Sequence, residues 1–192
     1  MQSARFAILL LALPVALSAQ QPQGAPTTDP MTAVSRTRTM ALQRNLAQAF
    51  DSIPAAMFSY KPTPAQQTVG YIAQHLANDN YFFCNNFGEM KATRPEEETA
   101  TPDSVKATWP KEKLVASLKA SFTFCEQAFA QLNDAALAGT YTATQGGQTR
   151  TVSRMSPVIG HLIDMADHYS QIANYMRLNN MLPPTALPRP RP

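Results

Sequence analysis

The feature that most constrains the fold is a set of four segments with helical apolar periodicity, each with proline or glycine at or near at least one end. They cover roughly residues 30–53, 63–87, 108–132 and 153–182. Apolar residues recur at intervals of three and four, which is the spacing of one helix face. Asp29 and Pro30 can open the first segment, and Gly88 can end the second. Four such helices predict an all-α, up-and-down-like four-helix bundle.

The connection between the third and fourth helices has a different pattern. Residues 140–152, "TYTATQGGQTRTV", alternate polar and β-branched side chains around Gly146 and Gly147. This pattern predicts a small β-hairpin. The longer polar stretch over residues 89–107 is expected to be a loop, and "PEEE" within it is interpreted as solvated rather than as a binding site.

The beginning of the chain is interpreted as a signal for export. Residues 1–19 contain Arg5, a short apolar run and small residues that end at Ala19, which is the pattern of a secretory signal peptide. The apolar run is too short to span a bilayer. We expect a periplasmic or secreted protein with a flexible linker over 20–30, a bundle over 31–184 and a Pro/Arg tail over 185–192.

Charge and motifs exclude several classes of function. The chain has 16 basic and 13 acidic residues, and loss of Arg5 with the signal leaves 15 against 13. This small, dispersed excess argues against nucleic-acid binding, and no membrane association is expected after signal removal. The sequence shows neither a Ser/His/Asp constellation nor a Gly-rich phosphate loop. The expected partner is a small-molecule substrate of unknown structure, with a homodimer left open.

Two of the three histidines lie on the core-facing side of the last helix. His161 and His168 share this face with apolar residues, and Asp164 lies on its flank. Because the helix rises about 1.5 Å per residue, the two histidines are roughly 10 Å apart and cannot both bind one ion. A pair of Asp164 with either histidine remains open. The third histidine, His75, lies at the edge of the apolar stripe of the second helix, near Asp79.

Two stretches resemble a known family. "YKPTPAQQTVGYIAQHLANDNYFFC" and "HYSQIANYMRLNNMLPP" are similar to the DinB/YfiT-like proteins, which are four-helix bundles that in many cases bind a divalent metal through three histidines. The resemblance covers residues 32–184. It implies that His75 and His168 are two of the ligands. The third ligand position falls on Asp164, where the family pattern has histidine.

Aspartate at this position has two interpretations. A carboxylate four residues before His168 can still chelate from one helix face, so His75, Asp164 and His168 would form a site of two histidines and one carboxylate. Zinc is the first expectation for this site, with iron, manganese or nickel as alternatives. Otherwise the site has degenerated and Asp164 only hydrogen-bonds a histidine. His161 and Asp79 would be outer residues or alternative ligands.

The two cysteines, Cys84 and Cys125, lie on the second and third helices. In an exported protein, cysteines on neighbouring helices favour a disulfide. The alternative is a pair of buried thiols that only pack in the core.

Three functions are compatible with these observations. The first is a metal-dependent thiol S-transferase, as the resemblance implies, although export separates the protein from cytoplasmic thiols. The second is metal-assisted hydrolysis, in which Asp79 could act as a base. The third is a non-catalytic or stress-associated helical bundle with a degenerate metal site.

Overall fold

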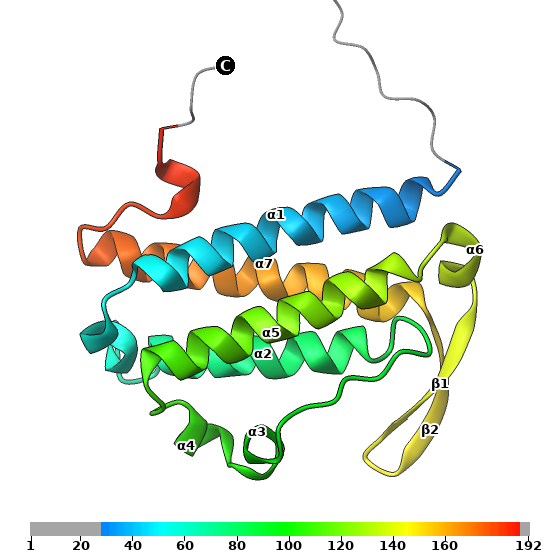
Figure 1. Ribbon diagram of the computed structural model, residues 1–192, viewed down its shortest axis with the longest axis horizontal. Coiled ribbons are helices and arrows are strands. Elements are labelled where there is room, and N and C mark those ends of the chain that lie inside the picture. Colours follow the sequence, from blue (N-terminus) through cyan, green and yellow to red (C-terminus); the bar gives the residue numbers. More distant parts are fainter. Residues whose placement is uncertain (1–27, 189–192) are drawn as a thin grey trace, which may run out of the picture.

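The computed structural model describes residues 28–188; the predicted signal peptide, most of the predicted linker and the end of the tail lie outside these residues. Four long helices lie side by side and form a bundle (Figure 1). They are α1 (Pro30–Ser52), α2 (Val69–Cys84), α5 (Lys111–Ala130) and α7 (Met155–Leu178). The prediction of an all-α four-helix bundle is confirmed.

The helix directions differ from the predicted up-and-down order, because α2 and α5 run parallel. Asn80 of α2 donates a hydrogen bond to Ser121 of α5 over 2.8 Å, and Cys84 is joined to Cys125; the two pairs have the same sequence separation of 41. A constant offset means that both helices run in one direction. The reason is the connection over residues 85–110, which returns along the bundle before α5 begins (Figure 1).

This connection is more ordered than the predicted loop. It contains two short helices, α3 (Glu96–Ala100) and α4 (Asp103–Lys106). The ammonium group of Lys106 is buried and donates to Asn78 Oδ1 of α2 over 3.2 Å, and it pairs with Asp103 over 2.9 Å. These contacts hold α4 against α2. The "PEEE" stretch lies partly in α3, where Glu98 forms an ion pair with Arg94 over 3.6 Å.

Helix α2 begins later than the sequence predicts. Thr68 is its N-cap, and the Thr68 hydroxyl accepts a hydrogen bond from the backbone N–H of Tyr71 over 3.1 Å. The backbone N–H of Val69 donates to the carbonyl of Tyr60, which lies just after the 3-10 helix η1 (Ala55–Ser59). The predicted start at Thr63 was wrong because this cap fixes the first turn.

The predicted hairpin is confirmed. Strands β1 (Thr140–Gln145) and β2 (Gln148–Ser153) pair antiparallel, and a short helix, α6 (Asp134–Leu137), precedes them. The two residues of the turn, Gly146 and Gly147, have φ values of 59° and 76°. A tight turn with two positive φ values favours glycine at both positions and matches the twist of a hairpin.

The core divides into two clusters along the bundle. The larger one lies among all four long helices and includes Phe50, Leu76, Leu118 and Ile172. The second surrounds the disulfide and includes Phe87 and Phe129. A last 3-10 helix, η2 (Pro184–Ala186), follows α7.

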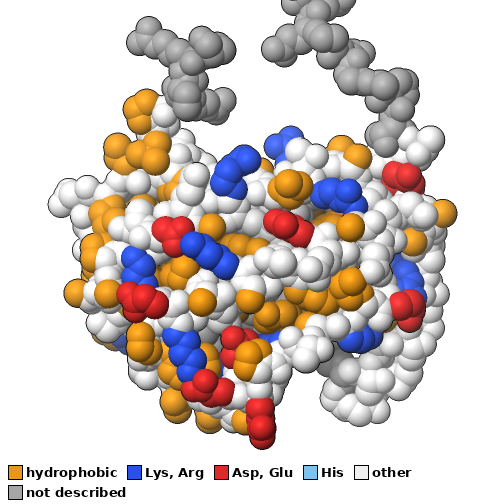
Figure 2. All heavy atoms as spheres, viewed as in Figure 1, with side chains coloured by type: hydrophobic (Ala, Val, Ile, Leu, Met, Phe, Trp, Pro, Cys, Tyr) orange, Lys and Arg blue, Asp and Glu red, His pale blue; other side chains and the backbone are white. Residues whose placement is uncertain are grey.

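Two further features of the fold are the distribution of surface charge and the apolar character of the helices. On the face shown in Figure 2, acidic and basic side chains are interspersed, and neither sign forms a large patch. Within residues 28–188, no helix combines the length and the apolar character that crossing a membrane requires.

Candidate metal centre

Three predicted ligands meet between α2 and α7. One donor atom from each of His75, Asp164 and His168 lies within 4.8 Å of the other two. The imidazole rings of His75 and His168 meet edge to face, with centroids 4.9 Å apart. The site therefore joins one histidine of α2 to an aspartate and a histidine one turn apart on α7.

The packing of α2 against α7 explains this convergence. A Cβ atom on Gly160 would lie 2.7 Å from Cε1 of Phe83, so the missing side chain lets the Phe83 ring lie against α7. His75 lies eight residues before Phe83 on α2, and His168 lies eight residues after Gly160 on α7. The rings of these two histidines are in contact. The two helices are therefore antiparallel, and the contact at Gly160 sets the register that brings the histidines together.

On each helix a histidine is paired with an aspartate four residues away. Nε2 of His168 lies 3.4 Å from Oδ1 of Asp164, and Nε2 of His75 lies 3.3 Å from Oδ2 of Asp79. The His168 and Asp164 side chains are 8% and 16% exposed, whereas His75 and Asp79 are 29% and 28% exposed. The α7 side of the site is therefore buried, and solvent reaches it from the α2 side.

The neighbouring charges shift two ionisable groups. Burial opposes protonation of His168, but the adjacent Asp164 carboxylate outweighs it and raises the pKa of His168 above its usual value. Burial also raises the pKa of Asp79; His75 opposes this shift and the charge of Asp164 adds to it. The negative charges of Asp79 and Asp164 therefore act on the same site and favour a positive charge there.

The donor set fits a divalent cation. Within residues 28–188, Oδ2 of Asp164 and Nδ1 of His168 are buried without a hydrogen-bond partner, and such atoms are costly unless they gain one. The ligand bonds of an ion such as zinc are about 2.0–2.2 Å long. The three donor atoms, which lie within 4.8 Å of one another, therefore need to approach only modestly to bind one ion. A doubly charged ion would also neutralise the paired carboxylates of Asp79 and Asp164. The assignment of these residues as ligands stays a prediction.

His161 lies in a different environment, against the disulfide. The Cys84–Cys125 disulfide is present, with Cα atoms 5.3 Å apart. Nε2 of His161 lies 3.9 Å from the Cys84 sulfur, 3.7 Å from the Cys125 sulfur and 2.8 Å from Oδ1 of Asn80. Burial lowers the pKa of His161 to about 4, so the ring is neutral. The structure brings His168, and not His161, together with His75.

Asn80 is a buried polar residue that sequence reasoning missed. Its side chain is fully buried, and it accepts a hydrogen bond from His161 while donating to Ser121. A signal was present, because Asn80 follows Leu76 by four residues on the apolar stripe of α2. A polar residue at such a position needs a buried partner.

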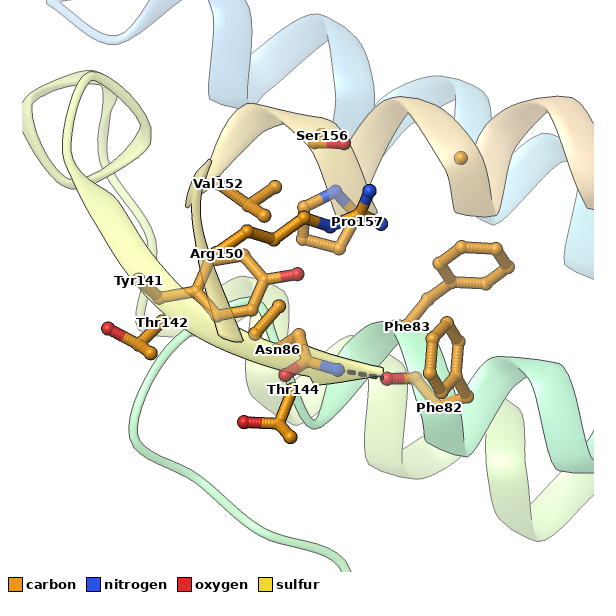
Figure 3. Close-up of a pocket in the computed structure, with 12 residues that line it drawn as sticks. Phe82, Phe83, Asn86, Tyr141, Thr142, Thr144, Arg150, Val152, Ser156 and Pro157 are labelled. Carbon is orange, nitrogen blue, oxygen red and sulfur yellow. Dashed lines mark hydrogen bonds between the residues drawn. The ribbon is translucent and has the colours of Figure 1, made fainter. Parts of the chain in front are cut away.

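A pocket of about 320 Å³ lies where the hairpin meets α2 and α7. Figure 3 shows Tyr141, Arg150 and Val152 of the hairpin on one side, and Phe82 and Phe83 of α2 on the other. Gly160 also lines the pocket and is one helical turn from Asp164. Arg150 is the one formally charged residue in the lining. The pocket is therefore a neighbour of the candidate metal centre along the same pair of helices.

Fold and site together define a four-helix-bundle protein with a candidate metal centre between its second and last long helices. The sequence matches the model of the DinB superfamily over residues 38–172. The chain belongs to the DinB superfamily. No curated protein matches the sequence significantly.

Solved structures show the same fold at low sequence identity. YfiT from Bacillus subtilis, described as a probable metal-dependent hydrolase with an unusual four-helix bundle topology, is 14% identical with a TM-score of 0.60; the match covers 84% of this chain and 94% of YfiT. A DinB-like protein from Bacillus subtilis is 15% identical with a TM-score of 0.60, covering 81% and 96%.

A third structure belongs to a longer protein. A mycothiol-dependent maleylpyruvate isomerase is 15% identical with a TM-score of 0.57, and the match covers 73% of this chain and 60% of the isomerase. This chain thus spans 60% of the isomerase's length. At these identities the similarity concerns the fold.

Proposed function

We propose that this protein binds a divalent metal ion through His75, Asp164 and His168 and catalyses a metal-dependent hydrolysis. The observation that supports the proposal is the convergence of these three donors within 4.8 Å at a partly buried site. Zinc is the proposed ion, with iron, manganese or nickel as alternatives, because a mixed nitrogen and oxygen donor set discriminates poorly among them.

Each side chain has a defined part in this proposal. An ion bound there would act as a Lewis acid and would ease deprotonation of a water molecule. Asp79 lies beside His75 at the solvent side and has a raised pKa, so its carboxylate is placed to accept a proton. Asp164 supplies the anionic donor and orients His168 through their 3.4 Å contact.

The hairpin pocket is the proposed place for the substrate. Its lining residue Gly160 is one turn from Asp164, and its wall combines aromatic and aliphatic groups with hydroxyl and amide groups and one guanidinium, that of Arg150. A small molecule with an apolar part would fit this lining, and its scissile group would have to extend from the pocket toward Asp164. Export, with which the buried disulfide is compatible, is also part of the proposal.

A thiol-dependent transferase is the second candidate. It is favoured by the structural similarity to the mycothiol-dependent isomerase. The same three donors would then ease deprotonation of a low-molecular-weight thiol. A supply of such a thiol outside the cytoplasm is needed, which is why we place hydrolysis first. A non-catalytic bundle is the outcome if metal binding is absent.

Metal content and a zinc titration test the proposal. Purified mature protein with its disulfide intact should contain close to one equivalent of divalent metal, and the apoprotein should bind zinc in calorimetry. His168→Ala should weaken zinc binding by at least about 100-fold, since loss of even an outer partner costs about 10–100-fold. His161→Ala is the matched control and should bind zinc as the wild type does.

Activity is measured on the same proteins. Zinc-loaded wild type should hydrolyse members of a panel of small amides and esters with apolar groups, and His168→Ala should not. Turnover only in the presence of an added low-molecular-weight thiol would favour the transferase. Equal zinc affinity in wild type and His168→Ala would refute the metal centre.

A further inference from the structure

A second set of metal-ligating groups lies in the core, apart from the candidate metal centre. Cys84, Cys125 and His161 are all buried, and their ligand atoms lie within 4.8 Å of one another. In the oxidised protein the two sulfurs are bonded to each other. We propose that reduction of this disulfide creates a binding site for a thiophilic divalent ion, held by both thiolates and by His161.

The distances from the histidine to the sulfurs are close to those of a metal site. Nε2 of His161 lies 3.9 Å and 3.7 Å from the sulfurs of Cys84 and Cys125. With zinc bonds of about 2.3 Å to sulfur and 2.0 Å to nitrogen, tetrahedral ligands are roughly 3.5–3.8 Å apart. The two sulfurs, once reduced, must separate to make room for the ion, and the hydrogen bond from Nε2 of His161 to Asn80 must open.

Asn80 can complete the set. Its amide nitrogen donates to Ser121 over 2.8 Å, so its Oδ1 is the atom that faces Nε2 of His161 at 2.8 Å. The oxygen thus lies on the same side of the imidazole as both sulfurs. Three ligand atoms within 4.8 Å of one another, together with the Asn80 oxygen in contact with one of them, thus come from three helices, and only the two sulfurs are engaged by the covalent bond.

The net charge of the metal-bound site is compatible with its apolar environment. The rings of Phe83, Phe87 and Phe129 surround His161, with centroids 6.1, 5.6 and 6.4 Å from its own. An apolar environment opposes any net charge. Two thiolates and one divalent ion sum to zero, whereas two free thiolates would not. Burial therefore selects the metal-bound form over the bare dithiolate.

The imidazole also limits which ions bind. In the oxidised protein Nε2 carries the proton that it donates to Asn80, and Nδ1 of His161 is buried with no hydrogen-bond partner in the described part of the chain. Coordination through Nε2 moves the proton to Nδ1, where it finds no acceptor. The cost is overcome by ions that form strong bonds to thiolate, such as zinc, cadmium or cobalt(II).

The chemistry balances in two steps. A dithiol reductant breaks the Sγ–Sγ bond: it supplies two electrons and two protons, becomes a cyclic disulfide, and leaves Cys84 and Cys125 as thiols. The ion then replaces the two thiol protons, which are released to solvent. The oxidised protein has no thiolate to offer, so the redox state controls whether the site exists.

The test uses full-length mature protein carrying His168→Ala, which disables the candidate metal centre and keeps the two hypotheses separate. One sample keeps its disulfide and the other is reduced with a phosphine, which takes oxygen from water to become the phosphine oxide and likewise leaves both cysteines as thiols. Cobalt(II) is added and followed by absorption spectroscopy. The reduced sample should bind one equivalent with a thiolate-to-cobalt charge-transfer band and release two protons, and zinc should abolish the band. The oxidised sample should show no such band.

Two further variants test the histidine. In the reduced His168→Ala background, His161→Ala should weaken cobalt binding at least about 10-fold, since a direct ligand matters no less than an outer partner. His75→Ala, the matched control, should leave it unchanged. Absence of the band in the reduced protein, or equal affinity with and without His161, would overturn the proposal.

Loss of structure on reduction is itself informative. If reduction lowers the helical circular dichroism, addition of zinc should restore it, because the ion re-links α2, α5 and α7. Failure of zinc to restore the helical signal would also overturn the proposal.

Discussion

His75 and His168 meet edge to face across the α2–α7 interface, with ring centroids 4.9 Å apart and planes at 86°. The contact joins residues 93 positions apart in the chain. Each ring is also paired with an aspartate on its own helix, His75 with Asp79 and His168 with Asp164. Two His–Asp pairs facing each other form an acidic, nitrogen-rich site, and its behaviour can be tested by substitution.

Replacement of Asp164 tests the departure from the family pattern. Asp164→His should keep zinc affinity within about tenfold of the wild type, because imidazole also ligates zinc, and should lower the preference for manganese relative to zinc. Asp164→Ala should weaken both. Competition titrations with the two metals on each variant measure the ratio. An unchanged manganese-to-zinc ratio in Asp164→His would show that this carboxylate does not contact the ion.

His161 should make stability of the metal-free, disulfide-bonded protein pH-dependent. Its pKa is lowered from 6.5 to about 4 by burial. Between these values the unfolded state binds a proton that the folded state does not, so stability present above pH 6.5 is lost as the pH falls toward 4. The shift corresponds to roughly 3 kcal/mol.

Urea unfolding from pH 7.5 to 4 measures this dependence. His161→Gln should be less stable at neutral pH but should lose less stability on acidification, since glutamine does not titrate. The same pH dependence in wild type and His161→Gln would contradict the assignment.

Removal of the disulfide should destabilise the protein. The bond closes a loop with a sequence separation of 41, for which the chain-entropy model gives about 4 kcal/mol. Cys84→Ala combined with Cys125→Ala should therefore lower the free energy of unfolding by an amount of this order. Chemical denaturation under non-reducing conditions measures the difference. A loss below about 1 kcal/mol would mean that the bond does not restrict the unfolded chain as the model assumes.

Gly70 should not tolerate a side chain. A Cβ atom there would overlap the carbonyl oxygen of Ala107 and would lie 3.2 Å from that of Phe58. Because both obstacles are backbone, Gly70→Ala should cost about 1–3 kcal/mol. Gly88→Ala is the matched control, since no atom of the described residues lies within 4 Å of its Cβ position. Thermal unfolding should show a lower midpoint for Gly70→Ala alone; equal midpoints for the two variants would contradict the packing.

The four long helices and the hairpin follow from local patterns. Apolar spacing, caps and prolines depend on neighbouring residues in the chain, so the sequence is sufficient to predict them. Gly146 and Gly147 predict the turn for the same reason, because positive φ is a local property of glycine. The start of α2 was missed because Thr68, and not Thr63, makes the capping hydrogen bond.

The candidate site was predictable only in part. The spacing of Asp164 and His168 follows from helix geometry, and the family resemblance assigned His75 and His168 as ligands, whereas the residues by themselves left either His161 or His168 open. The choice between His161 and His168 as the partner of His75 depends on how α7 slides along α2. That register is set by the Phe83 ring over Gly160, a contact that no local pattern contains.

What the sequence by itself determined is therefore each helix and the face that it buries, because both depend on residues within a few turns of one another. The tertiary structure decided the relative direction and register of the helices. It made α2 and α5 parallel, so that Cys84 meets Cys125, and it made α2 and α7 antiparallel, so that His75 meets His168. The physical reason is that direction and register arise from close packing between segments far apart in the chain, where the shape of each interface selects one arrangement among several with similar apolar faces.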